Sequence, residues 1–453
     1  MLRIVRNDTA SVEQLTYYSA AIAAKAAIQT SRLQTSIYPI WNTPISPLHP
    51  PPRMLARMPR PLPVLIPLLA MFAVQTMTSM GDLTVPVLAP AAAGDTGVAA
   101  TYIGVWMGVL YAAAMASGLL TGGLVLRHGA VRVCQGAAVL AALGLGAFAL
   151  AHPVAALASA VLLGSAYGVV NPAASHVLAA QSPARWRALI FSIKQSGVTL
   201  GGMLAGAVAP TLAGLVGWQG AALWIALASL AIGAAMQPTR AALDADRQPD
   251  AARRPGGVTA PIRLILTTPV LRGLTVAAFF FSGVQVCLFS FYALYMTDAL
   301  GLSLVTAGLA YASVQAGGIA GRLLWGALSG GLISSGGMLF LLGGAAAALM
   351  LMTGASAADL PLPALFTLSA LLGACALGWN GIFLSEVARL APDGRIGEAT
   401  GGAQFFFFAG AVLIPPVFGA VIGFTGDYAP AFMTTAAMSI AASLSVALAL
   451  RRR

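Results

Sequence analysis

The chain has 453 residues, of which only 8% are charged and 58% are apolar, and its formal net charge is +11. A soluble domain carries about 25% charged residues, so the chain has too few charges to cover the surfaces of soluble domains. Collagen-like, disordered and disulfide-scaffold proteins are also excluded, because the 50 glycines follow no three-residue period, apolar residues dominate and only three cysteines occur. A multi-pass protein of the lipid bilayer remains.

The basic residues do not indicate a nucleic-acid partner, because they lie between apolar blocks instead of along one amphipathic element. The three cysteines lie in separate apolar blocks and have no metal-ligand spacing, so they read as small core residues. No metal site and no cofactor are expected. No enzyme is expected either, because nucleophiles, bases and metal ligands do not cluster.

Residues 1–60 form the first segment, which we expect to be a cytoplasmic tail. Lys25 interrupts its Ala-rich stretch, so a cleaved signal peptide is not expected. The segment is either flexible or an over-long start, with initiation at Met54 or Met58.

Twelve apolar blocks follow, each long enough for a membrane-spanning helix of about 20 residues. Their Ala/Leu/Gly-rich and continuous composition excludes the short alternating segments of a β-barrel. The predicted helices are 62–89, 99–121, 131–151, 154–180, 188–215, 218–236, 268–297, 303–329, 332–354, 361–390, 397–423 and 428–450.

The connections between these helices differ in charge on the two sides. Those after the odd-numbered helices contain no Lys or Arg, whereas the other side is rich in Arg. Since Lys and Arg mark the cytoplasmic side, both termini are predicted to be cytoplasmic, in a bacterial inner membrane. The polar stretch 237–266 reads as a cytoplasmic linker between two six-helix bundles, 61–236 and 267–450, and 451–453 is a basic end.

The two bundles repeat each other at an offset near 210 residues. Gln75 and Gln285, and likewise Lys194 and Gln404, differ by 210 positions, and Asn171 and Asn380 differ by 209. This common offset indicates a duplication, and transporters commonly place their substrate site between such repeats.

At this point the chain resembles the major facilitator superfamily over residues 60–450. The loop after the second helix is similar to the family's motif G-x-L-a-D-R-x-G-r-k at Gly122, Leu124, Arg127 and Gly129, but Leu126 replaces the Asp. A second copy after the eighth helix matches at Arg322, Trp325 and Gly326, but Gly330-Gly331 replaces Asp-Arg. The resemblance implies twelve transmembrane helices in two pseudo-symmetric bundles, and a gating latch weakened by the missing acids. The gating residues implied are Gly122, Arg127, Gly129, Arg322 and Gly326.

Gly197 and Gly201, and Gly202 and Gly206, are each four residues apart on the fifth helix. They are read as close helix packing in preference to the family's antiporter signature, whose proline is missing.

Charged residues within the helices are costly and mark candidate sites. Lys194 lies about 10 Å into the fifth helix, where it either meets an anionic substrate or extends to the cytoplasmic interface. Asp82, His176 and Glu386 are candidate proton carriers. The alternatives are an interfacial Asp82 at a break in the helix, a packing role for His176, and an inner gate or salt bridge formed by Glu386 and Arg322.

Uncharged polar and aromatic residues complete the candidate substrate site, since the resemblance implies a cavity lined by helices 1, 2, 4, 5, 7, 8, 10 and 11. Each of them has an alternative role in bonding to a neighbouring helix. They are Gln75, Asn171, Gln285, Tyr292, Tyr311, Gln315, Trp379, Asn380 and Gln404.

The sequence therefore predicts a monomeric secondary active transporter that moves a small organic anion with protons by alternating access. A drug or metabolite efflux antiporter is the alternative, and a transport-inactive membrane sensor is a remote one. The absence of a phosphate-binding loop leaves ATP-driven transport without support.

Overall fold

The computed structural model describes residues 62–183, 187–248, 259–329, 332–392 and 395–451, and the predicted tail 1–60 lies outside them. The described residues are almost entirely helical and contain no strand apart from one isolated bridge. Eleven apolar helical runs are long enough to cross a membrane, and one of them, Ile190–Leu243, contains two helices. The twelve predicted helices are thus confirmed.

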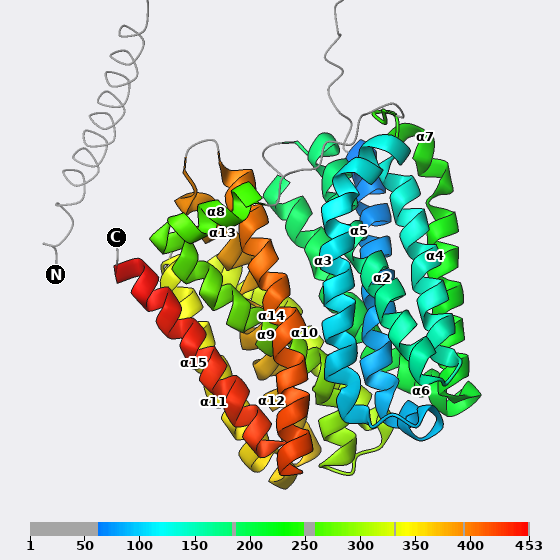
Figure 1. The fold of residues 1–453 in the computed structure, drawn as a ribbon, viewed down its shortest axis with the longest axis vertical. Coiled ribbons are helices and arrows are strands. Elements are labelled where there is room, and N and C mark those ends of the chain that lie inside the picture. Colours follow the sequence, from blue (N-terminus) through cyan, green and yellow to red (C-terminus); the bar gives the residue numbers. More distant parts are fainter. Residues whose placement is uncertain (1–61, 184–186, 249–258, 330–331, 393–394, 452–453) are drawn as a thin grey trace, which may run out of the picture. The chain divides into compact units, whose positions relative to one another are not determined.

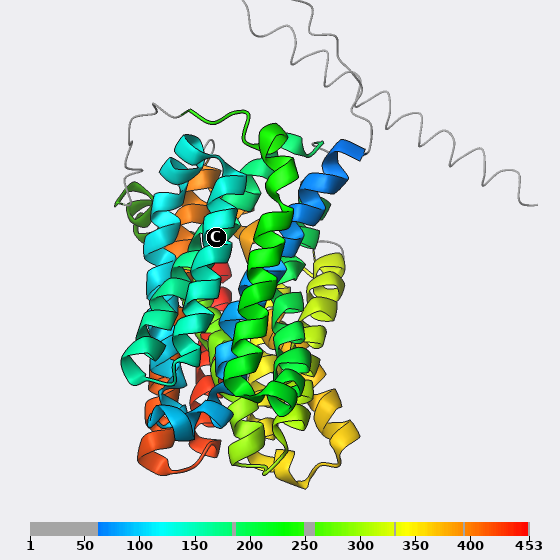
Figure 2. The ribbon, with the colours of Figure 1, turned by 90° about the vertical axis from the view of Figure 1, so that its right-hand side faces the viewer.

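The first bundle consists of α2 (Leu62–Thr96), α3 (Ile103–His128), α4 (Ala130–Ala149), α5 (Pro153–Gln181) and the two parts of α6 (Arg187–Ala235). The second consists of α9 (Pro269–Asp298), α10 (Leu304–Leu328), α11 (Ser335–Ser356), α12 (Leu362–Leu377) with α13 (Asn380–Leu390), α14 (Ile396–Thr425) and α15 (Ala429–Arg451). Figures 1 and 2 show these helices running roughly along one common axis. The short elements between them are η1 (Ala100–Tyr102), η3 (Gln237–Thr239), α7 (Arg240–Leu243), α8 (Thr259–Thr267) and η4 (Ala357–Asp359).

Glycines determine the ends of several helices. The length of the apolar block alone predicts these ends incorrectly. α2 and α3 extend about one to two turns beyond their predicted ends, because a helix can continue past its apolar part until a residue breaks it. Gly97 (φ 66°) follows α2 and Gly129 (φ 91°) separates α3 from α4. Gly217 (φ 76°, ψ 162°) divides α6 into the predicted fifth and sixth helices. A side chain is disfavoured at such backbone angles, so glycine fits each turn.

The tenth helix is interrupted at Gly378 and Trp379, between α12 and α13. Two side chains of α10 compensate for the carbonyl groups that the end of α12 leaves unpaired. Trp325 Nε1 donates to the Ala374 carbonyl oxygen at 2.8 Å, and Arg322 Nε donates to that of Leu377 at 3.2 Å. Side chains of α10, the eighth transmembrane helix, therefore stabilise the interruption of the tenth.

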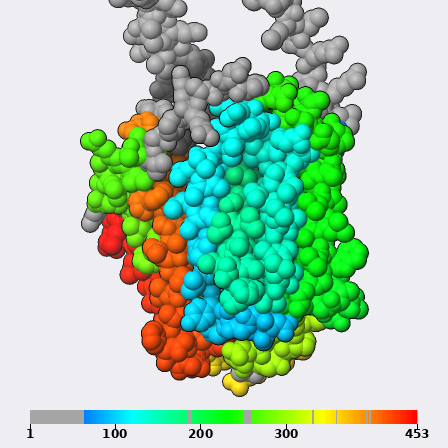
Figure 3. Space-filling model, turned by 45° about the vertical axis from the view of Figure 1, so that its right-hand side comes forward, coloured from blue at the N-terminus to red at the C-terminus, as the bar shows by residue number. Residues whose placement is uncertain are grey.

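The two bundles pack in the same way, as a duplication requires. α2 packs on α6 and α3 on α5, while their counterparts α9 and α10 pack on α14 and α12. The contacts between the bundles are also matched, because α6 packs on α10 as α14 packs on α3. Figure 3 shows the face on which α3 and α14 lie side by side. The fold is thus two pseudo-symmetric six-helix bundles.

Large apolar side chains cover the outer surface of many helices. Leu119, Leu120, Leu223, Trp224 and Leu444 are each more than half exposed. A continuous helix can present such a surface to lipid because its backbone groups are bonded internally. This surface is the one expected of a multi-pass membrane protein.

The helices α4, α6 and α14 begin at the same end of the bundles, which is at the top in Figure 1. We call it the basic end, because Arg127, Arg132 and Arg240 lie in or beside its connections. The other end is the distal end. Near the distal end, Gly206 of α6 lies against α10, and Gly108 of α3 lies against α14. A Cβ atom on Gly206 would be 3.0 Å from the Ala312 backbone nitrogen, and one on Gly108 would be 2.8 Å from the Val412 carbonyl oxygen. Glycine thus allows the backbones of the two bundles to approach closely at this end.

Candidate functional site

Lys194 lies inside the first bundle and does not extend to the basic end. Its side chain is 1% exposed. Nζ donates to the side-chain oxygen of Asn171 on α5, and to the backbone carbonyl of the same residue at 3.4 Å. None of the ion pairs among the described residues includes Lys194. The cation is therefore held by neutral oxygen atoms alone.

The equivalent positions in the second bundle form a neutral pair. Asn380 Nδ2 donates to Gln285 Oε1 at 3.2 Å, and the half-buried Gln404 stands where the first bundle has Lys194. Gln75, the counterpart of Gln285, is fully buried, and neither its Nε2 nor its Oε1 atom has a partner. Gln75 thus lacks the hydrogen bond that its counterpart Gln285 makes.

Arg322 joins the two bundles next to Lys194. Its NH1 group donates to the backbone carbonyl of Gln195 on α6 at 3.1 Å, while Nε donates to that of Leu377 on α12. The guanidinium also interacts electrostatically with the phenol of Tyr167. No carboxylate pairs with Arg322 among the described residues. Two cations without acidic partners therefore lie close to the same turn of α6.

Aromatic rings connect the interior of the second bundle to the first. Trp379 is fully buried and stacks on Phe281, with ring centroids 5.1 Å apart, and it also contacts Phe407 at 5.9 Å. Phe408 lies 6.3 Å from Tyr111 of α3. The indole nitrogen of Trp379 has no hydrogen-bond partner. Part of the Phe405–Phe408 run thus packs between the bundles.

Asp82 is 2% exposed on α2, which continues through it without the break that an interfacial aspartate would need. Its Oδ1 atom has no hydrogen-bond partner. The carboxylate lies within electrostatic range of the phenols of Tyr111, Tyr167 and Tyr311, which come from α3, α5 and α10. A buried carboxylate with so few partners is the kind of group that binds a cation.

The other two candidate proton carriers are paired near the basic end. His176 Nε2 lies 2.7 Å from Asp246 Oδ2, and both side chains are partly exposed. Glu386 is buried on α13 and pairs with Arg389 on the same helix. Their partners are Asp246 and Arg389, and neither of the two pairs includes Asp82 or Lys194.

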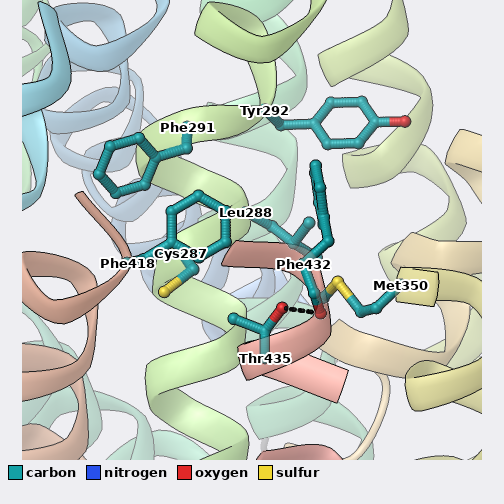
Figure 4. Close-up of a pocket in the computed structure, with 8 residues that line it drawn as sticks. All are labelled: Cys287, Leu288, Phe291, Tyr292, Met350, Phe418, Phe432 and Thr435. Atoms are coloured by element: carbon teal, nitrogen blue, oxygen red, sulfur yellow. Dashed lines mark hydrogen bonds between the residues drawn. The ribbon is translucent and has the colours of Figure 1, made fainter. Parts of the chain in front are cut away.

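Tyr292 is the predicted site residue that lines the pocket shown in Figure 4. The pocket is apolar and too tight for a water molecule. The Tyr292 hydroxyl bonds instead to Ser369 Oγ at 2.7 Å. This geometry fits helix packing better than solute binding. The lining residues are Cys287, Leu288, Phe291, Tyr292, Met350, Phe418, Phe432 and Thr435.

The loop motif is supported by an acid from elsewhere in the chain. The buried Asp244, which ends α7, accepts hydrogen bonds from the backbone nitrogens of Val131 at 2.8 Å and Arg132 at 3.3 Å. The backbone nitrogen of Gln248 donates to the carbonyl of Leu126, the residue at the lost Asp position, at 2.6 Å. Sequence reasoning missed Asp244, because only the fold shows that the linker lies on this loop.

The remaining motif residues are placed near the basic end. Gly122 and Gly326 are exposed, with no atom near the position of an added Cβ, and Arg127 is exposed in the last turn of α3. Gly129 is buried against the carboxyl group of Asp244. The contacts of Gly129 with Asp244, and of Arg322 with two backbone carbonyls, thus account for these two residue types.

The family model of the Major Facilitator Superfamily matches residues 68–415. The chain belongs to this superfamily. No curated protein matches the sequence. Solved structures show the same fold at low identity. A bacterial homologue of the human lysosomal transporter Spinster, inward-facing and occupied, is 16% identical with a TM-score of 0.69, over 87% of this chain and 98% of that one. A D-xylose-proton symporter is 15% identical with a TM-score of 0.65, over 84% of this chain and 96% of that one.

Membership makes this protein a transporter of a small molecule. Of the predicted site residues, the fold brings Lys194 together with Asn171, and Gln285 together with Asn380.

Proposed function

We propose that the protein is a proton-coupled secondary active transporter of a small organic anion in a bacterial inner membrane. The basic end would then face the cytoplasm, because Arg-rich connections remain on that side. Among the described residues, the observation that carries the substrate class is the buried Lys194, which has no acidic partner.

The electrostatic argument starts from the cost of that burial. A lysine at membrane depth costs about 2.5–3.5 kcal/mol on insertion scales, so its retention there favours a functional role. Two neutral oxygens of Asn171 satisfy part of its hydrogen-bonding capacity but leave its charge uncompensated. A carboxylate between Lys194 and Arg322 would compensate both cations and would contact both bundles.

Asp82 supports the coupling role. It is the buried acid with an unpaired oxygen, and it lies on α2 within electrostatic reach of tyrosines from both bundles. Binding of a proton to Asp82 would remove a buried negative charge. A change in the packing of the bundles that alters the access of solvent to this carboxylate would therefore accompany proton binding or release.

Uptake into proteoliposomes tests the substrate class. The purified protein would be offered a panel of small carboxylates and of organic cations, with and without a proton gradient. We expect uptake of a carboxylate that Lys194→Ala abolishes and that Arg272→Gln, which removes an exposed cation, leaves unchanged. Anion uptake that survives Lys194→Ala would rule out the anion site.

The efflux reading keeps one observation in its favour. A series of aromatic rings extends across the interface between the bundles, and flat apolar cations bind to the faces of aromatic rings. The rings are those of Phe281, Trp379, Phe407, Phe408 and Tyr111. Selective transport of hydrophobic cations in the same panel would establish efflux and exclude the anion carrier.

A further inference from the structure

A series of aromatic rings crosses from the second bundle to the first, and we call it the aromatic series. Trp379 contacts Phe407 of α14 with ring centroids 5.9 Å apart, and Phe407 contacts Phe408 at 5.4 Å. Phe408 lies 6.3 Å from Tyr111 of α3, and Tyr111 lies 5.8 Å from Tyr167 of α5. All of these distances are within the range of interacting aromatic pairs, so the series is continuous.

A second group of rings shows how aromatic side chains pack when they serve packing alone. Within the second bundle, Phe418 contacts Phe291 at 4.7 Å and Phe432 at 5.7 Å, and all three line the pocket in Figure 4. Each of these three side chains is at most 3% exposed. Phe407 and Phe408, in contrast, are only half-buried. The aromatic series therefore keeps surface that the chain itself does not cover.

The indole of Trp379 has a donor without an acceptor. Trp379 is fully buried, and its Nε1 atom has no hydrogen-bond partner. The indoles of Trp106, Trp218 and Trp325 each donate to an oxygen at 2.7 or 2.8 Å. Since a buried Trp N–H usually has an acceptor, the missing acceptor at Trp379 is one that a bound molecule can supply.

Arg322 connects the aromatic series to the cation of the first bundle. Its Nε atom donates to the carbonyl of Leu377, two residues before Trp379, at 3.2 Å. Its NH1 group donates to the carbonyl of Gln195, the residue after Lys194, at 3.1 Å. Two hydrogen bonds thus place one cation between the turn of Lys194 and the interruption at Trp379. Two positive charges without acidic partners repel a cationic ligand and attract an anionic one.

We propose that the solute is an aromatic carboxylate. Its ring packs against Trp379, Phe407 and Phe408, because aromatic faces favour a planar ring over a saturated one. Its carboxylate lies between Lys194 and Arg322, and an oxygen of the same solute accepts the hydrogen bond of the indole. The inference rests on the proposed anion transport and adds the chemical class of the anion.

Isothermal titration calorimetry of the purified full chain in detergent at neutral pH tests this class. Benzoate would be compared with cyclohexanecarboxylate, which has the same charge and the same number of carbon atoms but no aromatic face. Aromatic pairing contributes about twofold to tenfold in affinity beyond the area that it buries, so we expect benzoate to bind more tightly by that factor. Trp379→Leu and Phe407→Leu should each remove this preference.

Phe418→Leu is the matched control, because it removes a ring from the same helix as Phe407 but outside the aromatic series. This variant should keep the preference for benzoate. If Trp379→Leu does not fold, Phe407→Leu carries the test, since it changes a half-buried ring.

The aromatic class would be overturned if the wild type bound neither acid, or bound benzoate no more tightly than cyclohexanecarboxylate. A preference that persists in both ring variants, or that Phe418→Leu also removes, would overturn it as well. Tighter binding of phenyltrimethylammonium than of benzoate would overturn it in favour of efflux. Failure of the proposed anion transport would appear separately in the uptake panel, as the absence of carboxylate uptake or as uptake that survives Lys194→Ala.

Discussion

The polar centres of the two bundles share one plan and differ at Lys194, where the second bundle has Gln404. In the second bundle Gln285 and Asn380 hydrogen-bond to each other, and Gln404 is neutral. In the first bundle the Oδ1 atom of Asn171 accepts a hydrogen bond from Lys194, and the side-chain amide of Gln75 is unpaired. The duplication thus supplies a symmetric scaffold, and Lys194 is one of the residues that make the two halves chemically different. This contrast makes Lys194 the position at which our proposed anion site can be tested against a built-in neutral counterpart.

Replacing Lys194 by Gln would make the first bundle resemble the second, and this change has the largest expected effect. A hydrogen bond to a charged group contributes about 1.5–3 kcal/mol, and each 1.4 kcal/mol is tenfold in affinity. We therefore expect the affinity for a carboxylate to fall by about tenfold to a hundredfold in proteoliposome uptake. The stability of the variant should not fall, because a buried charge is removed.

The matched control is Gln404→Ala, which changes the equivalent position without altering charge. It should affect carboxylate affinity less than Lys194→Gln does. Equal effects of the two variants would mean that the charge of Lys194 has no special role.

The second prediction removes the partner instead of the cation. Asn171→Ala would leave Lys194 buried with one weak carbonyl contact, and an unsatisfied buried group costs about 1–3 kcal/mol, and more if charged. We expect a loss of unfolding free energy in that range, measured by titrating the protein in mixed micelles with SDS. In the double variant Asn171→Ala/Lys194→Gln most of the loss should return. A loss that persists in the double variant would show that Asn171 acts through packing.

Helix number, order and the duplication could be predicted from the sequence, because spanning length and the offset between Gln75 and Gln285 are properties of the chain itself. The partners of Lys194 could not, since a lysine seven residues into a helix can turn toward either the interface or the interior. Packing decides between the two, and the chain places Asn171 of α5 within reach of the ammonium group. The interruption at Gly378 and Trp379 could not be predicted either. Both residues keep helical backbone angles, so the break needs no residue type that the sequence would reveal.

A third prediction concerns the linker, which lies on the loop of the first bundle. Asp244→Ala removes a buried carboxylate that caps α4, and loss of a helix cap costs about 0.5–2 kcal/mol. Asp246→Ala removes an exposed partner of His176, and a surface ion pair contributes about 0–1 kcal/mol. SDS titration should therefore rank Asp244→Ala as the more destabilising change. The reverse order would mean that the linker is held by His176 and not by the cap.

The smallest expected effect belongs to the neutral pair of the second bundle. Asn380→Ala removes the hydrogen bond to Gln285, and bonds of this kind between membrane helices average about 0.6 kcal/mol. The same substitution at Asn171 should cost several times more, because there a cation loses its partner. The ratio of the two losses, measured by one SDS titration protocol, is thus a direct measure of the asymmetry between the bundles. Equal losses would mean that Asn171 is no more important to its bundle than Asn380 is. The surroundings as a whole, and not Asn171, would then stabilise the ammonium group of Lys194.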